Sequence, residues 1–247
     1  MREIAAAVAE PIGRIGGAFM VSREAKAYSA ETGLTGWGPY FRGRCGVLGD
    51  VDADIVAAAA GFFPVETVRK AWESGADLPA ATTAERYAAV AHDFGRRKLA
   101  GFTASGRLAD LLRPVVDGGH VTAAPLFAGW RAMPLPGDDP ARVVQLAHVV
   151  RELRGGMHIA AVLASGLSPL EAVLSGHSAL LPDGEPNAEY FGWPRPYPEV
   201  TDEIRRRHDD AERLTDELMA PAFSVLDEAE AGELVVLLQK AERAIFD

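Results

Sequence analysis

The chain repeats part of its own sequence, and this repeat constrains its fold more than any other feature. The segment Tyr40–Arg44, which reads YFRGR, is echoed by Leu126–Trp130, which reads LFAGW, and each is followed by a turn that ends in glycine and aspartate. Further along, Gly61–Val68 (GFFPVETV) is echoed by Gly166–Val173 (GLSPLEAV), so both motifs occur in the same order in the two copies. Because a repeated helical unit buries its apolar face against its neighbour, the repeat predicts two related units with a ligand cleft between them.

Helical spacing of apolar residues predicts an all-α fold made of duplicated helical units packed together. We assign residues 1–180 to a helical domain that contains the repeat, with copies at about 38–75 and 124–178. A linker rich in proline and aromatic residues follows at 181–200, and residues 201–247 form the C-terminal helices. No pair of alternating runs indicates a β-hairpin.

Start and stop signals place several helices. The sequence Pro-Ile-Gly separates two predicted amphipathic helices, Met1–Glu10 and Gly17–Thr32. Pro140, after two aspartates, starts a long helix with an apolar residue every three to four positions. Ser168 and Glu171 form a capping box, which predicts the start of another helix.

Composition narrows the possible functions. A net charge of −10 disfavours a nucleic-acid partner, because the phosphates of nucleic acids attract basic proteins. The single cysteine, Cys45, excludes an internal disulfide and a multi-cysteine zinc site, and we expect it to be a small buried residue. No apolar run reaches the roughly 18–20 residues of a membrane span, and the N-terminus lacks the pattern of a signal peptide. We therefore expect a cytoplasmic protein without a membrane partner.

Three polar side chains interrupt the long predicted helix. Arg151, Arg154 and His158 are spaced by three and four residues, which places them on one stripe of about two turns. Such a stripe is typical of a site for an anion or a carbonyl group, with arginines as donors and a histidine as acid, base or ligand. We assign His158 and Arg154 as catalytic candidates and Arg151 as a ligand-binding candidate. The alternative is a set of surface or interhelix hydrogen bonds.

A second candidate site lies in the glycine-rich segment of the first copy. Tyr40, Arg42 and Arg44 are ligand-binding candidates, because a glycine-rich loop can bring arginines and backbone N–H groups onto a phosphate or carboxylate. Trp130 of the second copy joins them. The glycine spacing fits neither a P-loop nor a dinucleotide fingerprint. In the alternative interpretation, the aromatic residues anchor the loop and the arginines are solvated.

The histidines do not indicate a metal site. None of the six shows an H-E-x-x-H motif or another close ligand spacing, so we predict no metal ion and no specific cofactor. A haem with a single histidine ligand leaves almost no local signature, and this alternative stays open. The chain also lacks the nucleophile elbow of a serine hydrolase.

Several motifs together resemble a known family. They are Phe41-x-Gly43-Arg44 followed by Leu48-Gly49, the second unit at Leu126-Phe127, and Leu153-Arg154-Gly155-x-x-His158-x-Ala160-Ala161-x-Leu163. These motifs are similar to those of an actinobacterial helix-turn-helix family whose members pair a helical N-terminal part with a C-terminal part like the MarR winged helix. The similarity covers most of residues 8–178 and resumes at Thr201–Leu226. The resemblance implies no specific activity, and it implies that the C-terminal extension is a degenerate winged helix.

The chain departs from this family before Thr201. The family would place a recognition helix and a short β-wing there, but Leu180–Pro198 holds too many prolines for a helix and wing of normal length. A reader of the major groove needs a rigid helix that presents side chains to base edges. Arg205, Arg206 and Arg207 could contact phosphates, but their acidic neighbours favour a salt-bridged helix surface.

We therefore expect a protein that binds a small anionic or carbonyl-bearing metabolite between its two units. An enzyme of bacterial specialised metabolism that uses the His/Arg site is one form of this hypothesis, and whether the chain is catalytic stays open. A ligand-responsive MarR-like transcriptional regulator is the alternative. A third hypothesis is a protein-binding module that uses the aromatic segment Tyr190–Tyr197. The terminal helices predicted at Thr201–Met219 and Ala231–Ile245 would support a homodimer.

Overall fold

The computed structural model describes residues 1–177 and 183–247, and every regular element in these ranges is helical. The all-α prediction is confirmed. The start of the predicted linker, up to Pro182, lies outside the described residues. The elements are α1 (Arg2–Ala18), η1 (Phe19–Val21), α2 (Arg23–Thr32), α3 (Gly38–Arg44), η2 (Gly46–Leu48), α4 (Ala53–Ala60), α5 (Val65–Glu73), α6 (Ala80–Lys98), α7 (Ser105–Gly118), α8 (Pro125–Ala132), α9 (Asp139–Ala164), α10 (Pro169–Ser175), α11 (Glu185–Tyr190), α12 (Asp202–Phe223) and α13 (Glu228–Phe246).

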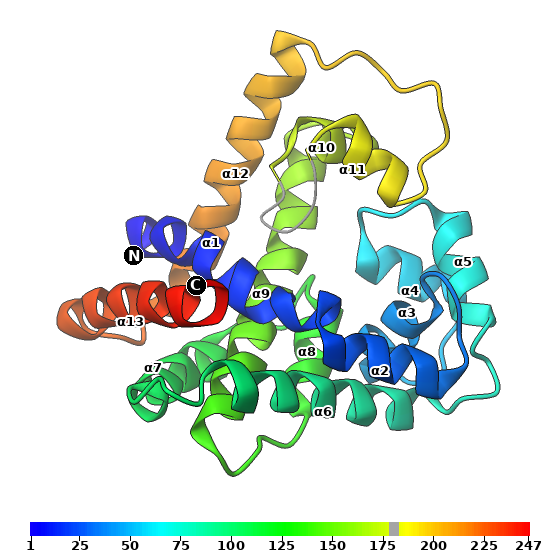
Figure 1. Ribbon diagram of the computed structural model, residues 1–247. Helices are drawn as coiled ribbons and strands as arrows, with labels where there is room; N and C mark the ends of the chain where they lie inside the picture. The colour runs from blue at the N-terminus through cyan, green and yellow to red at the C-terminus, as the bar shows by residue number, and fades with distance from the viewer. Residues whose placement is uncertain (178–182) are drawn as a thin grey trace.

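Helix α9 is the central element of the fold (Figure 1). It begins as predicted, because the Asp138 side chain accepts a hydrogen bond from the Ala141 backbone N–H and Pro140 occupies the first turn. Residues 143–150 are all buried, since α1, α6, α7, α8 and α12 pack around the helix. A helix that is apolar on all sides requires such enclosure.

The sequence predicted a break in helix α1 after Glu10, and this prediction was wrong. The helix is continuous, with Pro11 inside it and buried. A proline inside a helix removes one backbone hydrogen bond, but this stretch lies where α1 crosses α9. A Cβ added at Gly16 would lie 2.7 Å from the Ala147 carbonyl oxygen, so the two backbones are in direct contact there. Packing against α9 therefore outweighs the local helix-breaking signal.

The two ends of the chain lie side by side, with α1 packed against α12 and α13 (Figure 1). Buried residues of these three helices belong to one apolar core together with those of α9. Among the described residues, one segment, Arg2–Val21, is long and apolar enough to cross a membrane by length and composition, and 50% of that window is buried inside the structure. A core helix passes the same test.

The two copies of the repeat fold alike. In each, a short helix (α3 or α8) leads through a turn into a helix capped by an aspartate, Asp52 for α4 and Asp138 for α9. A glycine with positive φ then redirects the chain, Gly61 at 73° and Gly166 at 72°, a conformation that only glycine adopts without steric cost. Helix α5 or α10 follows. We call α3–α5 the first unit and α8–α10 the second unit.

The two units touch at equivalent positions of the repeat. The Trp130 indole N–H donates to the Arg44 carbonyl at 2.9 Å, and these residues occupy the same place in the two motifs. A Cβ added at Gly129 would lie 2.7 Å from a side chain of η2, and one at Gly61 would lie 2.5 Å from Ile159 of α9. The glycines allow this close approach, and the predicted packing of duplicated units is confirmed.

Between α10 and α12, the described residues 183–201 hold one short helix and no strand. Helix α11 corrects the prediction of an irregular linker, because a proline fits the first turn of a helix. The aromatic residues that follow fold back onto the first unit. The Phe191 and Phe63 ring centroids lie 4.4 Å apart, and the Trp193 indole N–H donates to the Phe62 carbonyl at 3.0 Å.

Candidate functional site

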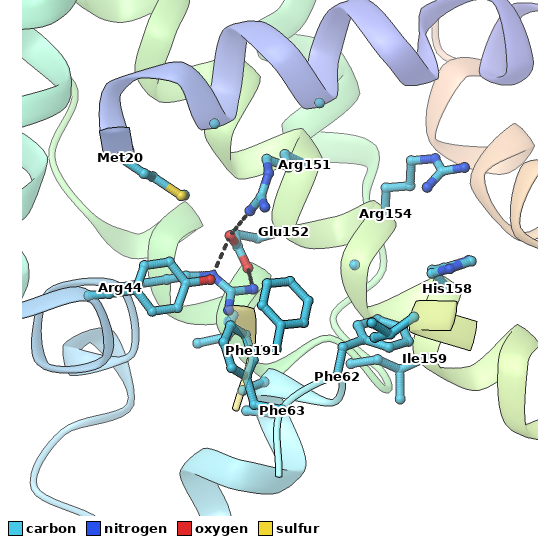
Figure 2. A pocket seen from close by; sticks show the side chains of 18 of the residues that line it. Met20, Arg44, Phe62, Phe63, Arg151, Glu152, Arg154, His158, Ile159 and Phe191 are labelled. Atoms are coloured by element: carbon cyan, nitrogen blue, oxygen red, sulfur yellow. Dashed lines mark hydrogen bonds and ion pairs between the residues drawn. The ribbon is translucent and has the colours of Figure 1, made fainter. Parts of the chain in front are cut away.

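A cavity of about 910 Å³ lies between the two units, where the repeat predicts a cleft. Its wall includes Phe62 and Phe63 from the turn of the first unit, and the face of α9 that carries Arg151 and His158. Helices α1, α2, α3, α4, α6, α8, α10, α11 and α12 and the turns between them contribute the remaining residues. The volume falls within the range of small-molecule sites, about 300–1,000 Å³. Figure 2 shows that polar side chains gather at two separate places in this cavity.

One end of the cavity holds a buried ion-pair cluster. Arg44 donates from Nε and Nη2 to the two carboxylate oxygens of Glu152 at 2.9 and 2.7 Å, and Arg151 donates to the same carboxylate at 2.9 Å (Figure 2). The side chains of Arg44 and Glu152 are 8% and 1% exposed. Two parallel hydrogen bonds fix the guanidinium on the carboxylate. Since Arg44 comes from α3 and Glu152 from α9, the cluster joins the two units.

This cluster carries one excess positive charge. Burial alone would raise the pKa of Glu152, but the neighbouring charges, Arg44 first among them, hold this pKa at about 2. Burial lowers the pKa of His148, beside the same carboxylate, to about 4, so the ring is neutral at pH 7. Two arginines therefore face one carboxylate. The charge in excess is that of Arg151, which lines the cavity with its side chain 30% exposed, and an anion bound beside it would balance this charge.

Three tyrosines, Tyr28, Tyr40 and Tyr87, line the cavity near this cluster. The Arg44 guanidinium lies 5.5 Å from the centre of the Tyr40 ring, and the rings of Tyr28 and Tyr87 meet edge to face at 5.5 Å. Burial raises the pKa of all three, that of Tyr28 to about 12, so the hydroxyls keep their protons. Among the described residues, the buried Tyr28 hydroxyl has no hydrogen-bond partner. Protonated hydroxyls can donate to a bound group.

Aromatic side chains form the wall next to these polar groups. Trp37 meets Phe63 and Tyr190 edge to face, each with ring centroids 5.0 Å apart. In Figure 2, Phe191, Phe63 and Phe62 lie between Arg44 and the far polar group. An apolar ligand body buried against this wall would gain about 25 cal/mol per Å² removed from water.

The second polar cluster lies where α9 faces α12. Arg154 donates to Oε2 of Glu212 at 2.6 Å. Nε2 of His158 lies 3.7 Å from Oε1 of the same carboxylate, and Nε2 of His208 lies 3.8 Å from it. Burial lowers the pKa of His158 to about 4 despite the charge of Glu212, so the ring is neutral at pH 7. The His158 ring packs on Phe62, with centroids 5.4 Å apart.

The structure brings five of the seven predicted site residues into one cavity: Tyr40, Arg44, Arg151, Arg154 and His158. They do not form a single cluster, because Arg154 and His158 turn toward α12 whereas Arg151 turns toward Glu152 (Figure 2). The predicted stripe on α9 is therefore divided between the two polar ends.

Arg42 and Trp130, the other two candidates, lie outside the cavity. Arg42 is 2% exposed, packs over the Trp72 ring at 4.2 Å and donates to the Leu78 carbonyl. Trp130 is buried in the contact between the units. Each residue of a helix is rotated by about 100° from the one before it. Arg42 and Arg44 are two positions apart and therefore point to roughly opposite sides of α3. Nor is Arg42 solvated, as the alternative interpretation held.

Sequence reasoning missed Glu152, Tyr28, Asn187 and Glu212 as residues of the cavity. The position of Glu152 could have been recognised, because an acidic residue in a largely apolar helix requires a buried partner. The other three come from α2, α11 and α12, and nothing in their local sequence shows that these helices meet around α9.

Among the described residues, no group of three or more histidine, cysteine, aspartate or glutamate side chains could hold a metal ion. Cys45 is buried, as expected, and burial raises its pKa to about 12. The thiol therefore stays protonated. The groups that can act on a bound molecule are the arginines, the tyrosine hydroxyls and the neutral imidazole of His158.

A family model matches nearly the whole chain. Its description is a helix-turn-helix family, and the match covers residues 5–247. No curated protein and no solved structure matches the chain. In the second unit, α9 and α10 are joined by a short turn with a bend of 106°, within the range of about 90–120° for a helix-turn-helix.

Proposed function

The chain belongs to this helix-turn-helix family, and from that premise we propose that its two units enclose a binding site for a small anionic metabolite. The observation that carries the proposal is the first polar end of the cavity, where Arg44 and Arg151 pair with a single carboxylate and three tyrosines line the same cavity. All five side chains can donate hydrogen bonds. A ligand with negative charge and acceptor oxygens satisfies them.

We assign different roles to the two arginines. Arg44 uses Nε and Nη2 on Glu152, so it serves to hold that carboxylate. Arg151 is half-buried and uses one nitrogen, Nη1, on Glu152, which leaves other donors for a ligand. In this proposal, Arg151 and the tyrosines bind the anion, and the aromatic wall holds the rest of the molecule.

Titration calorimetry with sodium decanoate and decan-1-ol tests this proposal, because the two probes share a chain and differ in charge. A charged hydrogen bond contributes about 1.5–3 kcal/mol, so decanoate should bind at least about tenfold more tightly. Arg151→Leu should abolish the preference. Arg213→Leu is the matched control, since Arg213 is exposed on α12 and lies outside the cavity. Equal affinity for the two probes, or an unchanged preference in Arg151→Leu, contradicts the proposal.

The catalytic roles of His158 and Arg154 stay a proposal. A pKa of about 4 leaves His158 neutral at pH 7, able to accept a hydrogen bond but a weak proton acceptor. Arg154 is engaged by Glu212. These contacts support a binding role for this end of the cavity more than an acid–base role.

A DNA-binding regulator is the second candidate function, and family membership favours it. The charges of the surface oppose it: Arg69 of α5 pairs with Asp54 and Glu66, and Arg207 of α12 pairs with Glu203. Fluorescence anisotropy with mixed-sequence duplex DNA at about 50 and 200 mM salt separates the candidates. Salt-sensitive binding supports a regulator, and no binding at the lower salt concentration speaks against one.

A further inference from the structure

The second polar end of the cavity offers hydrogen-bond acceptors, and the proton positions around His158 show why. The Thr215 hydroxyl lies 2.7 Å from the Ala211 carbonyl oxygen, a contact that requires its only proton. The hydroxyl oxygen therefore accepts from Nδ1–H of His158 at 3.0 Å. A neutral imidazole carries one proton, so Nε2 of His158 presents a lone pair.

Further polar atoms of the cavity lack a partner. Oε1 of Glu212 lies 3.7 Å from Nε2 of His158, beyond hydrogen-bond distance, and Nε2 of His208 is at 3.8 Å. The Asn187 side chain lines the cavity from α11 and is 6% exposed. Among the described residues, neither its Oδ1 nor Nε of Arg154 has a hydrogen-bond partner. The buried Oδ1 and Nε atoms are costly unless a bound molecule satisfies them, whereas the Glu212 side chain is 39% exposed.

In the cavity wall at this end, Arg154 and Glu212 neutralise each other and His158 is neutral. Asp216, which interacts electrostatically with Arg154 and Glu212, lies outside the cavity lining. A cationic group would therefore find no unpaired carboxylate in the wall at this end. A hydroxyl group fits better, since it can donate to Nε2 of His158 or Oε1 of Glu212 and accept from Nε of Arg154. The other end of the cavity, at Arg44, Arg151 and Glu152, carries an excess positive charge and therefore suits an anion.

The spacing of the two ends follows from α9. Arg151 and His158 are seven residues apart and lie on nearly the same side of the helix, about 10.5 Å along its axis at 1.5 Å per residue. The side chains of Phe62, Phe63 and Phe191 line the cavity beside these polar groups, with Phe62 next to His158 (Figure 2). A ligand that reaches both ends must therefore be elongated and apolar in its middle.

We propose that the cavity takes an elongated, apolar hydroxy acid, with its carboxylate at Arg151 and the tyrosines and its hydroxyl at His158, Glu212 and Arg154. This inference rests on the proposed function and adds the chemistry of the far end of the ligand. The carboxylate end supplies the charge that orients the molecule. The hydroxyl end supplies specificity, because an analogue without it leaves buried acceptors unpaired.

Calorimetric titration with decanoate, 10-hydroxydecanoate and 10-aminodecanoate tests the inference, because the three acids differ only at the far end. Wild-type protein should bind 10-hydroxydecanoate about tenfold more tightly than decanoate. His158→Phe keeps a flat ring on Phe62 but removes the lone pair, so this ratio should fall severalfold. Thr215→Val, a second variant of similar size, removes the acceptor that fixes the proton on Nδ1 and should reduce the ratio as well. Glu217→Gln on α12 is the control, since Glu217 is exposed and lies outside the cavity.

The outcomes separate this inference from the proposed function. Decanoate that binds as well as or better than 10-hydroxydecanoate overturns the inference and leaves the anion site intact. The tightest binding by 10-aminodecanoate overturns the hydroxyl assignment in favour of a cation site. A preference for 10-hydroxydecanoate that survives in His158→Phe and Thr215→Val places the hydroxyl elsewhere and overturns the inference. If no acid binds to wild-type protein, the proposed function fails and the inference with it.

Discussion

Replacing Glu152 with glutamine tests whether the buried ion pair holds the two units together. The substitution keeps the shape of the side chain but removes the charge that faces Arg44 and Arg151. Because Arg44 is 8% exposed, its guanidinium would remain in the interior without a counter-ion. Breaking a buried pair in this way costs about 3–5 kcal/mol. The adjoining cavity can admit solvent, so we expect a loss near the lower limit, about 3 kcal/mol.

Urea unfolding followed by far-UV circular dichroism at pH 7 measures this loss. Thermal unfolding gives a second measurement of the same loss. In a chain of this size each kcal/mol shifts Tm by roughly 2–4 °C, so Tm should fall by about 6–12 °C. Glu203→Gln is the matched control, because Glu203 pairs with Arg206 and Arg207 on the exposed face of α12, and surface pairs contribute about 0–1 kcal/mol. A loss in Glu152→Gln no larger than in the control would refute the reasoning.

The same variant should bind anions more tightly, even though it is less stable. Removing the carboxylate raises the excess charge at this end of the cavity, so the affinity for decanoate should rise by about tenfold, or 1.4 kcal/mol. Decanoate at 100 times its Kd would then add about 2.7 kcal/mol to the stability of the folded state. If decanoate does not raise the stability of Glu152→Gln, a ligand cannot reach the two arginines.

Lowering the pH should destabilise the protein through His148, whose pKa is about 4 when folded against an ordinary 6.5. The unfolded chain takes up the proton first, so stability is lost as pH falls from about 6.5 toward 4, by about 2.5 kcal/mol at pH 4.5. Urea unfolding at pH 7 and about pH 4.5 should show that His148→Gln loses less free energy of unfolding than wild type, by about this amount. If the free energy of unfolding falls with pH equally in both proteins, the assignment to His148 is contradicted. Gly61→Ala should cost about 2 kcal/mol or more, because φ is 73° and the new Cβ would lie 2.5 Å from Ile159. A Cβ added at Gly13 would have no atom within 4 Å, so Gly13→Ala should be neutral or stabilising. An equal Tm for the two variants would refute the close packing at Gly61.

Features that depend on a few neighbouring residues were predictable. The aspartate and proline that start α9, the capping box at Ser168 and the helical rhythm between them act within one or two turns. The repeat predicted two packed units because its glycines recur where the chain must turn or where helices approach closely. The stripe on α9 likewise placed Arg151, Arg154 and His158 in the cavity.

Local signals failed where distant segments supplied the deciding contacts. Pro11 stays inside α1 because α1 packs on α9, and a six-residue helix forms in the proline-rich segment after α10. Arg42 and Arg44 belong to the same motif, yet one stacks on Trp72 and the other binds Glu152 at the cavity. Only the tertiary structure could separate them.

The amino-acid sequence by itself determined the helices, their caps and the duplication, because these follow from propensity, capping and periodicity along the chain. It did not determine the division of the cavity into a donor end and an acceptor end. That division depends on which partner each polar group finds across α2, α3, α9, α11 and α12. Charge, burial and proton positions at such a site are properties of groups far apart in sequence, and only folding brings them within hydrogen-bond distance.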